Sequence, residues 1–155
     1  MEHLTNGGRT FVISSSDLAG TAGTEIPRIL IRNPVNSGKT LKIFKIEESV
    51  NTGTGNAMFR YYKNPTISVV GTLLNPANLN LNTHTSSMTS YLNPTISNNG
   101  TRMMQTIAGQ MYTLTKQSNY LWILNEGVDL LINVRTNAAG TTWNINLYYA
   151  EVDIA

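Results

Sequence analysis

The sequence contains one stretch whose residue types and spacing could bind a phosphate group. Asn36-Ser37-Gly38-Lys39-Thr40 ends in the Gly-Lys-Thr of a phosphate-binding loop. Such a loop requires a glycine five residues before its Gly-Lys pair and a helix after it. Asn33 stands at the glycine position, and the pattern of Leu41-Lys42-Ile43-Phe44 is typical of a strand. We therefore interpret Ser37-Gly38 as a hairpin turn between two strands rather than as part of a nucleotide site.

Metal-ligating and nucleophilic residues are few in this chain. The two histidines, His3 and His84, have no second histidine or carboxylate at the spacing of a zinc site. The sequence has no cysteine, which excludes a disulfide framework, a thiol nucleophile and cysteine-ligated zinc. It also lacks the GxSxG motif and the Ser/His/Asp order of a hydrolase.

The carboxylates do not form an acid–base pair either. Glu47 and Glu48 are adjacent, so on a strand they point to opposite faces and cannot share a glycosidic bond. Glu126 and Asp129 flank a predicted turn at Gly127, but a calcium ion needs more oxygen ligands than these two residues supply. We interpret them as solvated turn carboxylates. The sequence therefore predicts a protein that is not an enzyme and that holds no cofactor or metal.

Composition narrows the class of partner. Only 13% of the 155 residues are charged and the formal net charge is +2, whereas soluble proteins usually carry about 25% charged residues. The basic residues are scattered, which argues against nucleic-acid binding. No apolar run is long enough to cross a bilayer, and the polar start MEHLTNGGRT does not resemble a secretion signal. We expect neither a nucleic-acid nor a membrane partner.

Alternation of apolar and polar residues indicates strands along most of the chain. It is clearest in residues 128–134 and 143–149, which we interpret as an antiparallel hairpin across the turn at residues 137–140. Further strands are expected at residues 11–13, 28–32, 41–46, 57–62, 66–73, 111–115 and 120–124. The spacing of Met103, Met104, Ile107 and Met111 allows at most one short helix. The pattern predicts an all-β, jelly-roll-like antiparallel β-sandwich of about eight to ten short strands.

The domain organisation is expected to be simple. Residues 1–26 are rich in Gly, Ser and Thr, and we interpret them as an N-terminal arm with one short strand. Residues 27–155 are then a single sandwich domain. Two segments inside it nearly coincide: residues 62–72 are YKNPTISVVGT and residues 91–101 are YLNPTISNNGT. Either similar turns recur independently, or a duplicated unit places its two copies at related positions of the sandwich.

Residues 64–101 contain no Asp, Glu, Lys or Arg but are rich in Asn, Thr and Ser. The stretch is either a neutral exposed loop or a surface covered by other subunits, because the cores of interfaces are depleted in charge. The adjacent pairs Tyr61-Tyr62 and Tyr148-Tyr149 each place one ring on either face of a strand. One ring of each pair is expected in the core, and the other at an interface or on an exposed platform that could stack on a sugar.

Several stretches together resemble small structural proteins of tailed-phage virions. They are NPVNSGKTLKI at residues 33–43, GTLLNPANLN at residues 71–80 and the repeated YxNPTISxxGT segment, and residues 120–149 are similar as well. The resemblance covers most of residues 28–152. Such proteins often have a Pro-Gly turn before the penultimate strand, where this chain has Glu126-Gly127. The resemblance implies a trimeric jelly roll without catalytic residues, either a capsid decoration (cement) protein or a fibre or tip domain.

These observations lead to one expected function and one alternative. We expect a phage virion structural protein that binds the outer capsid surface as a homotrimer and stabilises the lattice of the major capsid protein. The alternative is a tail-fibre or receptor-binding tip domain that recognises host glycans. The residues expected at subunit or capsid interfaces are Ser86, Ser87, Thr89, Tyr61, Tyr62, Tyr148, Arg9 and Phe11.

Overall fold

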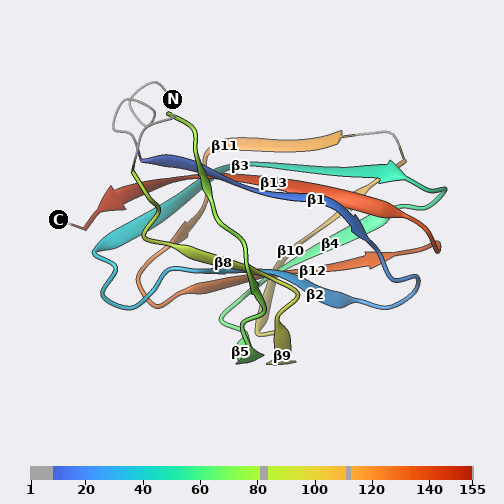
Figure 1. Cartoon of the computed structure of the whole chain (residues 1–155), viewed down its shortest axis with the longest axis horizontal. Coiled ribbons are helices and arrows are strands. Elements are labelled where there is room, and N and C mark those ends of the chain that lie inside the picture. Colours follow the sequence, from blue (N-terminus) through green and yellow to red (C-terminus); the bar gives the residue numbers. More distant parts are fainter. Residues whose placement is uncertain (1–8, 81–83, 111–112, 155) are drawn as a thin grey trace.

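The computed structural model describes residues 9–80, 84–110 and 113–154, and within these ranges every regular element is a β-strand (Figure 1). Eight long strands form the body of the molecule: β1 (Thr10–Ala19), β2 (Ile26–Arg32), β3 (Lys39–Thr52), β4 (Ala57–Lys63), β10 (Thr101–Ala108), β11 (Thr113–Leu124), β12 (Asp129–Thr136) and β13 (Thr142–Asp153). Five short strands lie between β4 and β10: β5 (Thr66–Val69), β6 (Thr72–Leu73), β7 (Ala77–Asn78), β8 (Thr89–Leu92) and β9 (Thr95–Asn98).

The long strands form two antiparallel sheets that lie as two layers in Figure 1. The first sheet has the order β11-β3-β13-β1-β7, and the second has the order β10-β4-β12-β2-β8-β6. Among the eight long strands, the first strand therefore pairs with the last, and the second pairs with the seventh. This interleaving of two Greek keys is the arrangement of a jelly roll. The predicted all-β antiparallel sandwich is confirmed.

The hydrophobic core fills the space between the sheets, because successive side chains of a strand point to opposite faces and the inward face of the long strands is apolar. In β2 and β12 the outward side chains Leu30 and Leu131 are buried as well. Trp143 of β13 is fully buried and meets the ring of Phe59 on the opposite sheet edge-on, with centroids 5.6 Å apart. Phe11 of β1 stacks on Tyr149 of β13 at 5.4 Å. Each such aromatic pair contributes about 0.5–1.5 kcal/mol beyond the area it buries.

The predicted hairpins are wrong, although most predicted strands coincide with observed ones. The strand expected at residues 66–73 is two strands, β5 and β6, and the two expected at residues 111–115 and 120–124 fall in one strand, β11. The described residues form thirteen strands instead of eight to ten. β12 and β13 follow one another in sequence but lie in different sheets, and the same holds for β2 and β3. The turn at Ser37-Gly38 therefore joins the two layers instead of closing a hairpin. Alternation reports which face of a strand is buried, and both layers bury one face in the same core, so the pattern does not identify the hydrogen-bonded neighbour.

The segment in which a short helix was allowed is the edge strand β10. Met104, Thr106 and Ala108 point inward, while Met103 and Ile107 are exposed on the outer face. These positions fit a period of two, and the apolar residues at helical spacing simply lie on both faces of the strand. Met111, the fourth member of the pattern, lies outside the described residues.

The boundary expected at residue 26 does not coincide with a boundary of the fold. β1 runs from Thr10 to Ala19 and pairs along β13, with Phe11 and Ile13 only 1% exposed. Residues 10–19 are thus the first strand of the sandwich and not a separate arm. Residues 1–8 lie outside the described part of the chain.

Candidate functional site

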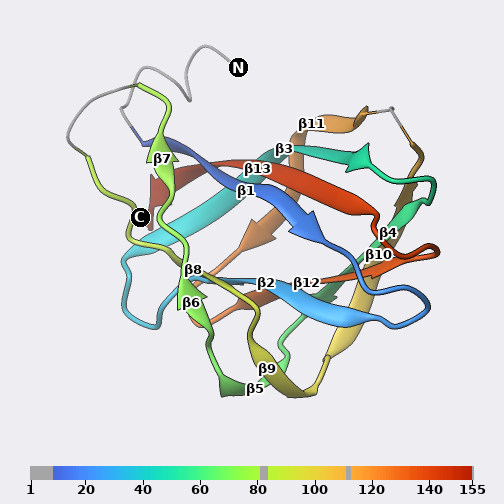
Figure 2. The same ribbon diagram turned by 45° about the vertical axis from the view of Figure 1, so that its right-hand side comes forward.

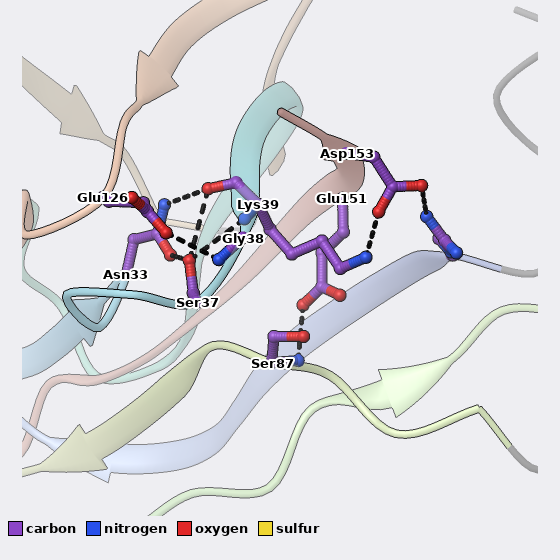
Figure 3. A network of polar contacts seen from close by, with 9 residues as sticks. Asn33, Ser37, Gly38, Lys39, Ser87, Glu126, Glu151 and Asp153 are labelled. Atoms are coloured by element: carbon purple, nitrogen blue, oxygen red, sulfur yellow. Dashed lines mark hydrogen bonds and ion pairs between the residues drawn. The ribbon is translucent and has the colours of Figure 1, made fainter. Parts of the chain in front are cut away.

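The segment between β4 and β10, residues 64–100, is called the insertion below. A first polar cluster attaches this insertion to the C-terminal strand, β13. Glu151 of β13 is 6% exposed and accepts hydrogen bonds from the Ser86 hydroxyl at 2.5 Å and from the Ser87 backbone N–H at 2.8 Å. The Met88 N–H lies 3.3 Å from the same carboxylate oxygen (Oε1). The Ser86 hydroxyl also bonds the Tyr149 hydroxyl at 2.7 Å. Figure 3 shows Ser87 facing Glu151 below the end of the sandwich.

The neighbouring surface of the same end is held by ion pairs. Asp153 of β13 pairs with both Arg9 and Lys39. In the adjoining turn, the Asn33 side-chain amide donates to the carbonyl of Lys39 at 2.8 Å, and the N–H of Gly38 donates to Glu126 at 2.6 Å (Figure 3). Gly38 and Lys39 of the Gly-Lys-Thr segment are therefore hydrogen-bonded to residues of the same chain. These contacts fix the loop that follows β2.

Glu126 and Asp129, the two carboxylates that flank Gly127, bind different partners. Glu126 binds the turn at Gly38, while Asp129 forms an ion pair with Arg32 at 3.1 Å. Within the described ranges, no group of three or more His, Asp or Glu side chains could hold a metal ion. Those ranges also contain no helix with the length and apolar character needed to cross a membrane.

Glu47 and Glu48 point to opposite faces of β3, as expected. Glu48 is fully buried and accepts hydrogen bonds from the Tyr61 hydroxyl and from the Thr106 hydroxyl, the latter at 2.6 and 2.7 Å to its two oxygens. Lys116 of β11 approaches Glu48 at 3.6 Å. Burial, together with the charge and hydrogen bond of Glu48, raises the pKa of Tyr61 well above its usual range. This network joins the open edges of the two sheets at β10 and β11.

The outer tyrosines of the two pairs form polar clusters of their own. Tyr148 donates to Glu47 at 2.8 Å, and the Lys45 ammonium lies 4.8 Å from the centre of its ring. Desolvation, followed by the hydrogen bond and charge of Glu47, raises the pKa of Tyr148 to about 12. Tyr62 donates to Glu25 at 2.7 Å, and Glu25 also accepts from Arg60 and Asn133.

The eleven-residue repeat forms two equivalent turns. Asn64 and Asn93 occupy the third position of each copy, and both have a φ of 52°, a left-handed conformation that asparagine tolerates. The N–H of Asn64 bonds the carbonyl of Asp129 at 2.9 Å, and the N–H of Asn93 bonds the carbonyl of Arg28 at 2.8 Å. Each turn therefore attaches one copy to a central strand of the second sheet.

Each copy also packs against the turn of the other. Gly71, with a φ of 93°, lies so close to the second turn that a Cβ there would stand 2.1 Å from the carbonyl oxygen of Leu92. Gly100, with a φ of 83°, is placed in the same way, 2.2 Å from the carbonyl oxygen of Lys63. The contacts are reciprocal, which favours the second interpretation of the repeat: a duplicated unit with its copies at related positions.

β5 and β9 complete this local symmetry as a two-stranded ribbon. They pair antiparallel with Ile67 opposite Ile96, so the same residue of both copies lies at a local two-fold axis. The ribbon projects from the second sheet in both views (Figures 1 and 2). Both strands show the same order of exposure, with isoleucine half-buried and its neighbours exposed. Val69 at the end of β5 is 58% exposed.

An open pocket lies in the same insertion, lined by residues in and around β6, β7 and β8. Its volume is about 470 Å³ and its lining is uncharged, with Leu73, Pro76 and Met88 as apolar residues and Asn75, Asn78, His84, Thr85, Ser86, Thr89 and Ser90 as polar ones. The sequence analysis did not anticipate this pocket, because it forms between segments whose approach depends on the pairing of β6 with β8 and of β7 with β1.

The residues expected at interfaces fall into three groups. Phe11 and Tyr61 are core side chains with at most 1% exposure, so they are not available to a partner. Tyr62 is 8% exposed and bound to Glu25. The half-buried residues are Ser86, Ser87 and Thr89 in the insertion, Tyr148 on the first sheet, and Arg9 at the end of the sandwich. Ser86, Ser87 and Arg9 lie close together around Glu151 and Asp153, whereas Tyr148 lies with Glu47 and Lys45.

Comparison with known proteins gives little further information. No protein-family model matches the chain, and no curated protein matches it. Among solved structures, the chain is similar to one in the full particle of Israeli acute paralysis virus heated to 63 degrees, with 11% identity and a TM-score of 0.29. The match covers 98% of this chain and 71% of the other. A likeness at this level carries no argument about function, which must be argued from the molecule itself.

Proposed function

We propose that the protein is a structural component of a tailed-phage virion, a decoration (cement) protein that binds the outer capsid surface as a homotrimer. The observation that carries this proposal is the insertion between β4 and β10. It has no charged residue from 64 to 101, yet it exposes the apolar side chains of Val69, Leu73 and Leu79 by 58%, 56% and 39%. Apolar surface without charge is characteristic of the core of a protein–protein interface.

The fold and the sequence support the same class of function. Jelly rolls of two Greek keys are common in viral capsid and lectin domains. The sequence resemblance to phage virion proteins covers most of residues 28–152 and includes the insertion, the turn after β2 and residues 120–149. We propose a mechanical rather than catalytic action, in which the trimer contacts neighbouring copies of the major capsid protein. A protein that binds only the assembled lattice stabilises that lattice by mass action.

A capsid-binding assay tests the proposal. Capsids stripped of the protein are mixed with the purified chain, sedimented, and heated until they release DNA. The proposal predicts that the chain sediments with capsids, and that decorated capsids release DNA at a higher temperature than stripped ones. Failure to sediment with capsids, without any change in the release temperature, would contradict it.

The alternative, a receptor-binding tip domain, is favoured by the 470 Å³ pocket. Its uncharged amide, hydroxyl and imidazole groups suit a neutral polyhydroxylated ligand, and Leu73, Pro76 and Met88 supply apolar surface for a sugar ring. A glycan array separates the two functions. Specific binding that is lost in Asn75→Ala, together with no affinity for capsids, would favour the tip domain.

A further inference from the structure

The two strands of the β5–β9 ribbon share their first three residues and differ at the fourth, which is Val69 in β5 and Asn98 in β9. β5 and β9 each follow an Asn-Pro turn and begin with Thr-Ile-Ser. The local two-fold axis passes through the Ile67–Ile96 pair and relates β5 to β9. The outer edges of the two strands therefore present equivalent backbone N–H and C=O groups. A strand that can pair with one edge can therefore pair with the other.

Neither outer edge has a neighbouring strand in the described part of the chain. Among the described strands, β5 and β9 pair only with each other. Proteins protect such edges with charged residues, very short strands, prolines or bulges. The ribbon has the last three, because each strand is four residues long, follows a proline and is irregularly paired. It has no charge, and the nearest charged residues in sequence are Lys63 and Arg102. A two-stranded ribbon is also marginally stable by itself and gains stability when further strands extend it.

We propose that the ribbon is the contact through which copies of this chain assemble, with the outer edge of β5 in one copy pairing with the outer edge of β9 in the next. A second copy is the partner that fits best, because it presents the sequence that each edge already pairs with inside its own chain. The absence of charge also removes repulsion between identical surfaces. The contact joins different edges, so it is head-to-tail and closes into a ring when the rotation permits.

This inference rests on the proposed homotrimer and specifies how it forms. Since each chain contributes a ribbon of two strands, three copies would close a six-stranded antiparallel ring. Leu73 and Leu79 of the insertion lie outside β5 and β9 and stay exposed, so they would remain available to the capsid.

Cross-linking tests the contact directly, because the chain contains no cysteine. Ser68→Cys places a thiol on β5, and Ser97→Cys places one on β9. The two variants carry different tags, are expressed together and are treated with a short thiol cross-linker. We expect cross-links between the two kinds of chain in excess of those formed by either variant alone. Ser14→Cys, an exposed serine on β1, serves as the matched control.

A second variant tests the contact without a cross-linker. Val69→Lys is expected to reduce the mass measured by light scattering from about three chains to one, while the circular dichroism stays that of the parent. The melting temperature should fall, because the separated chains lose the stability that assembly adds. If the parent is an oligomer but Val69→Lys assembles normally and the cysteine pair does not cross-link above the control, the ribbon contact is wrong and the virion function stands. If the parent is monomeric in solution and on capsids, the ribbon contact is wrong as well. Failure to bind capsids by a protein that cross-links as predicted would reject the virion function alone.

Discussion

At the scale of single residues, the buried carboxylate of Glu151 attaches the segment Ser86–Met88 of the insertion to the sandwich. It accepts from the Ser86 hydroxyl and from the backbone N–H groups of Ser87 and Met88. Removing the acceptor leaves buried donors without a partner, which costs about 1–3 kcal/mol. We expect Glu151→Ala to lower the free energy of unfolding by about that amount, measured by urea denaturation.

Asp153, two residues further along β13, gives the matched control. Its side chain is 59% exposed and its ion pairs with Arg9 and Lys39 lie in solvent, where such pairs contribute little. Asp153→Ala should therefore have a much smaller effect. Equal losses in the two variants would mean that Glu151 is not the main attachment of residues 86–88.

Glu25 predicts how stability depends on pH. Burial acts to raise the pKa of its carboxyl group, but hydrogen bonds from Tyr62, Asn133 and Arg60 and the charge of Arg60 outweigh burial, so the pKa is lowered below 4.5. A carboxyl group with a lowered pKa in the folded state adds stability above its unfolded pKa and loses it as the pH falls through the folded value. The parent should thus lose stability below pH 4.5, and Glu25→Gln should show a shallower loss in denaturation curves. An identical pH dependence of both proteins would reject the role given to Glu25.

At the scale of elements, the two copies of the repeat should respond alike to the same substitution. In Gly71→Ala and Gly100→Ala the new Cβ would stand 2.1 and 2.2 Å from backbone carbonyl oxygens, and both positions have positive φ. The left-handed conformation alone costs an alanine roughly 1–2 kcal/mol, and the collision adds to that cost. Gly140→Ala, at a φ of 71° with no atom within 4 Å, measures the conformational cost without the collision.

Urea denaturation of the three alanine variants tests this symmetry. We expect Gly71→Ala and Gly100→Ala to destabilise the protein by similar amounts, and both by more than Gly140→Ala. A large difference between the first two would show that the copies are not energetically equivalent.

The elements also show what the sequence could and could not predict. Alternation located most of the long strands, and placed Tyr149 inward and Tyr148 outward, because side-chain direction is a local property. It misassigned the partners of β12 and β13, since pairing depends on the whole topology. The contact between Ser86 and Glu151 could not be predicted for the same reason: the residues are distant in sequence and meet only when β7 and β8 attach to the sheets. The repeat was visible, but its two-fold arrangement required coordinates.

At the scale of the whole molecule, the sandwich combines a well-packed core with one uncharged and partly apolar insertion. The long strands interleave so that each of the two large sheets contains segments distant in the chain. The insertion is attached to this body through both copies of the repeat and through Glu151, and it carries three of the exposed apolar side chains, Val69, Leu73 and Leu79. This arrangement fits the proposed decoration protein, in which the sandwich supports the capsid lattice and the insertion joins copies of the chain.

Quantitative mass spectrometry of purified virions tests the central claim most directly. A decoration protein that bridges neighbouring capsid subunits must be present at a copy number that is a fixed, large fraction of the copy number of the major capsid protein. We predict that ratio for this chain, and its loss from virions treated to strip surface proteins while the capsid stays intact. Absence from virions, or a copy number that matches only the few positions of a tail or its fibres, would contradict the assignment.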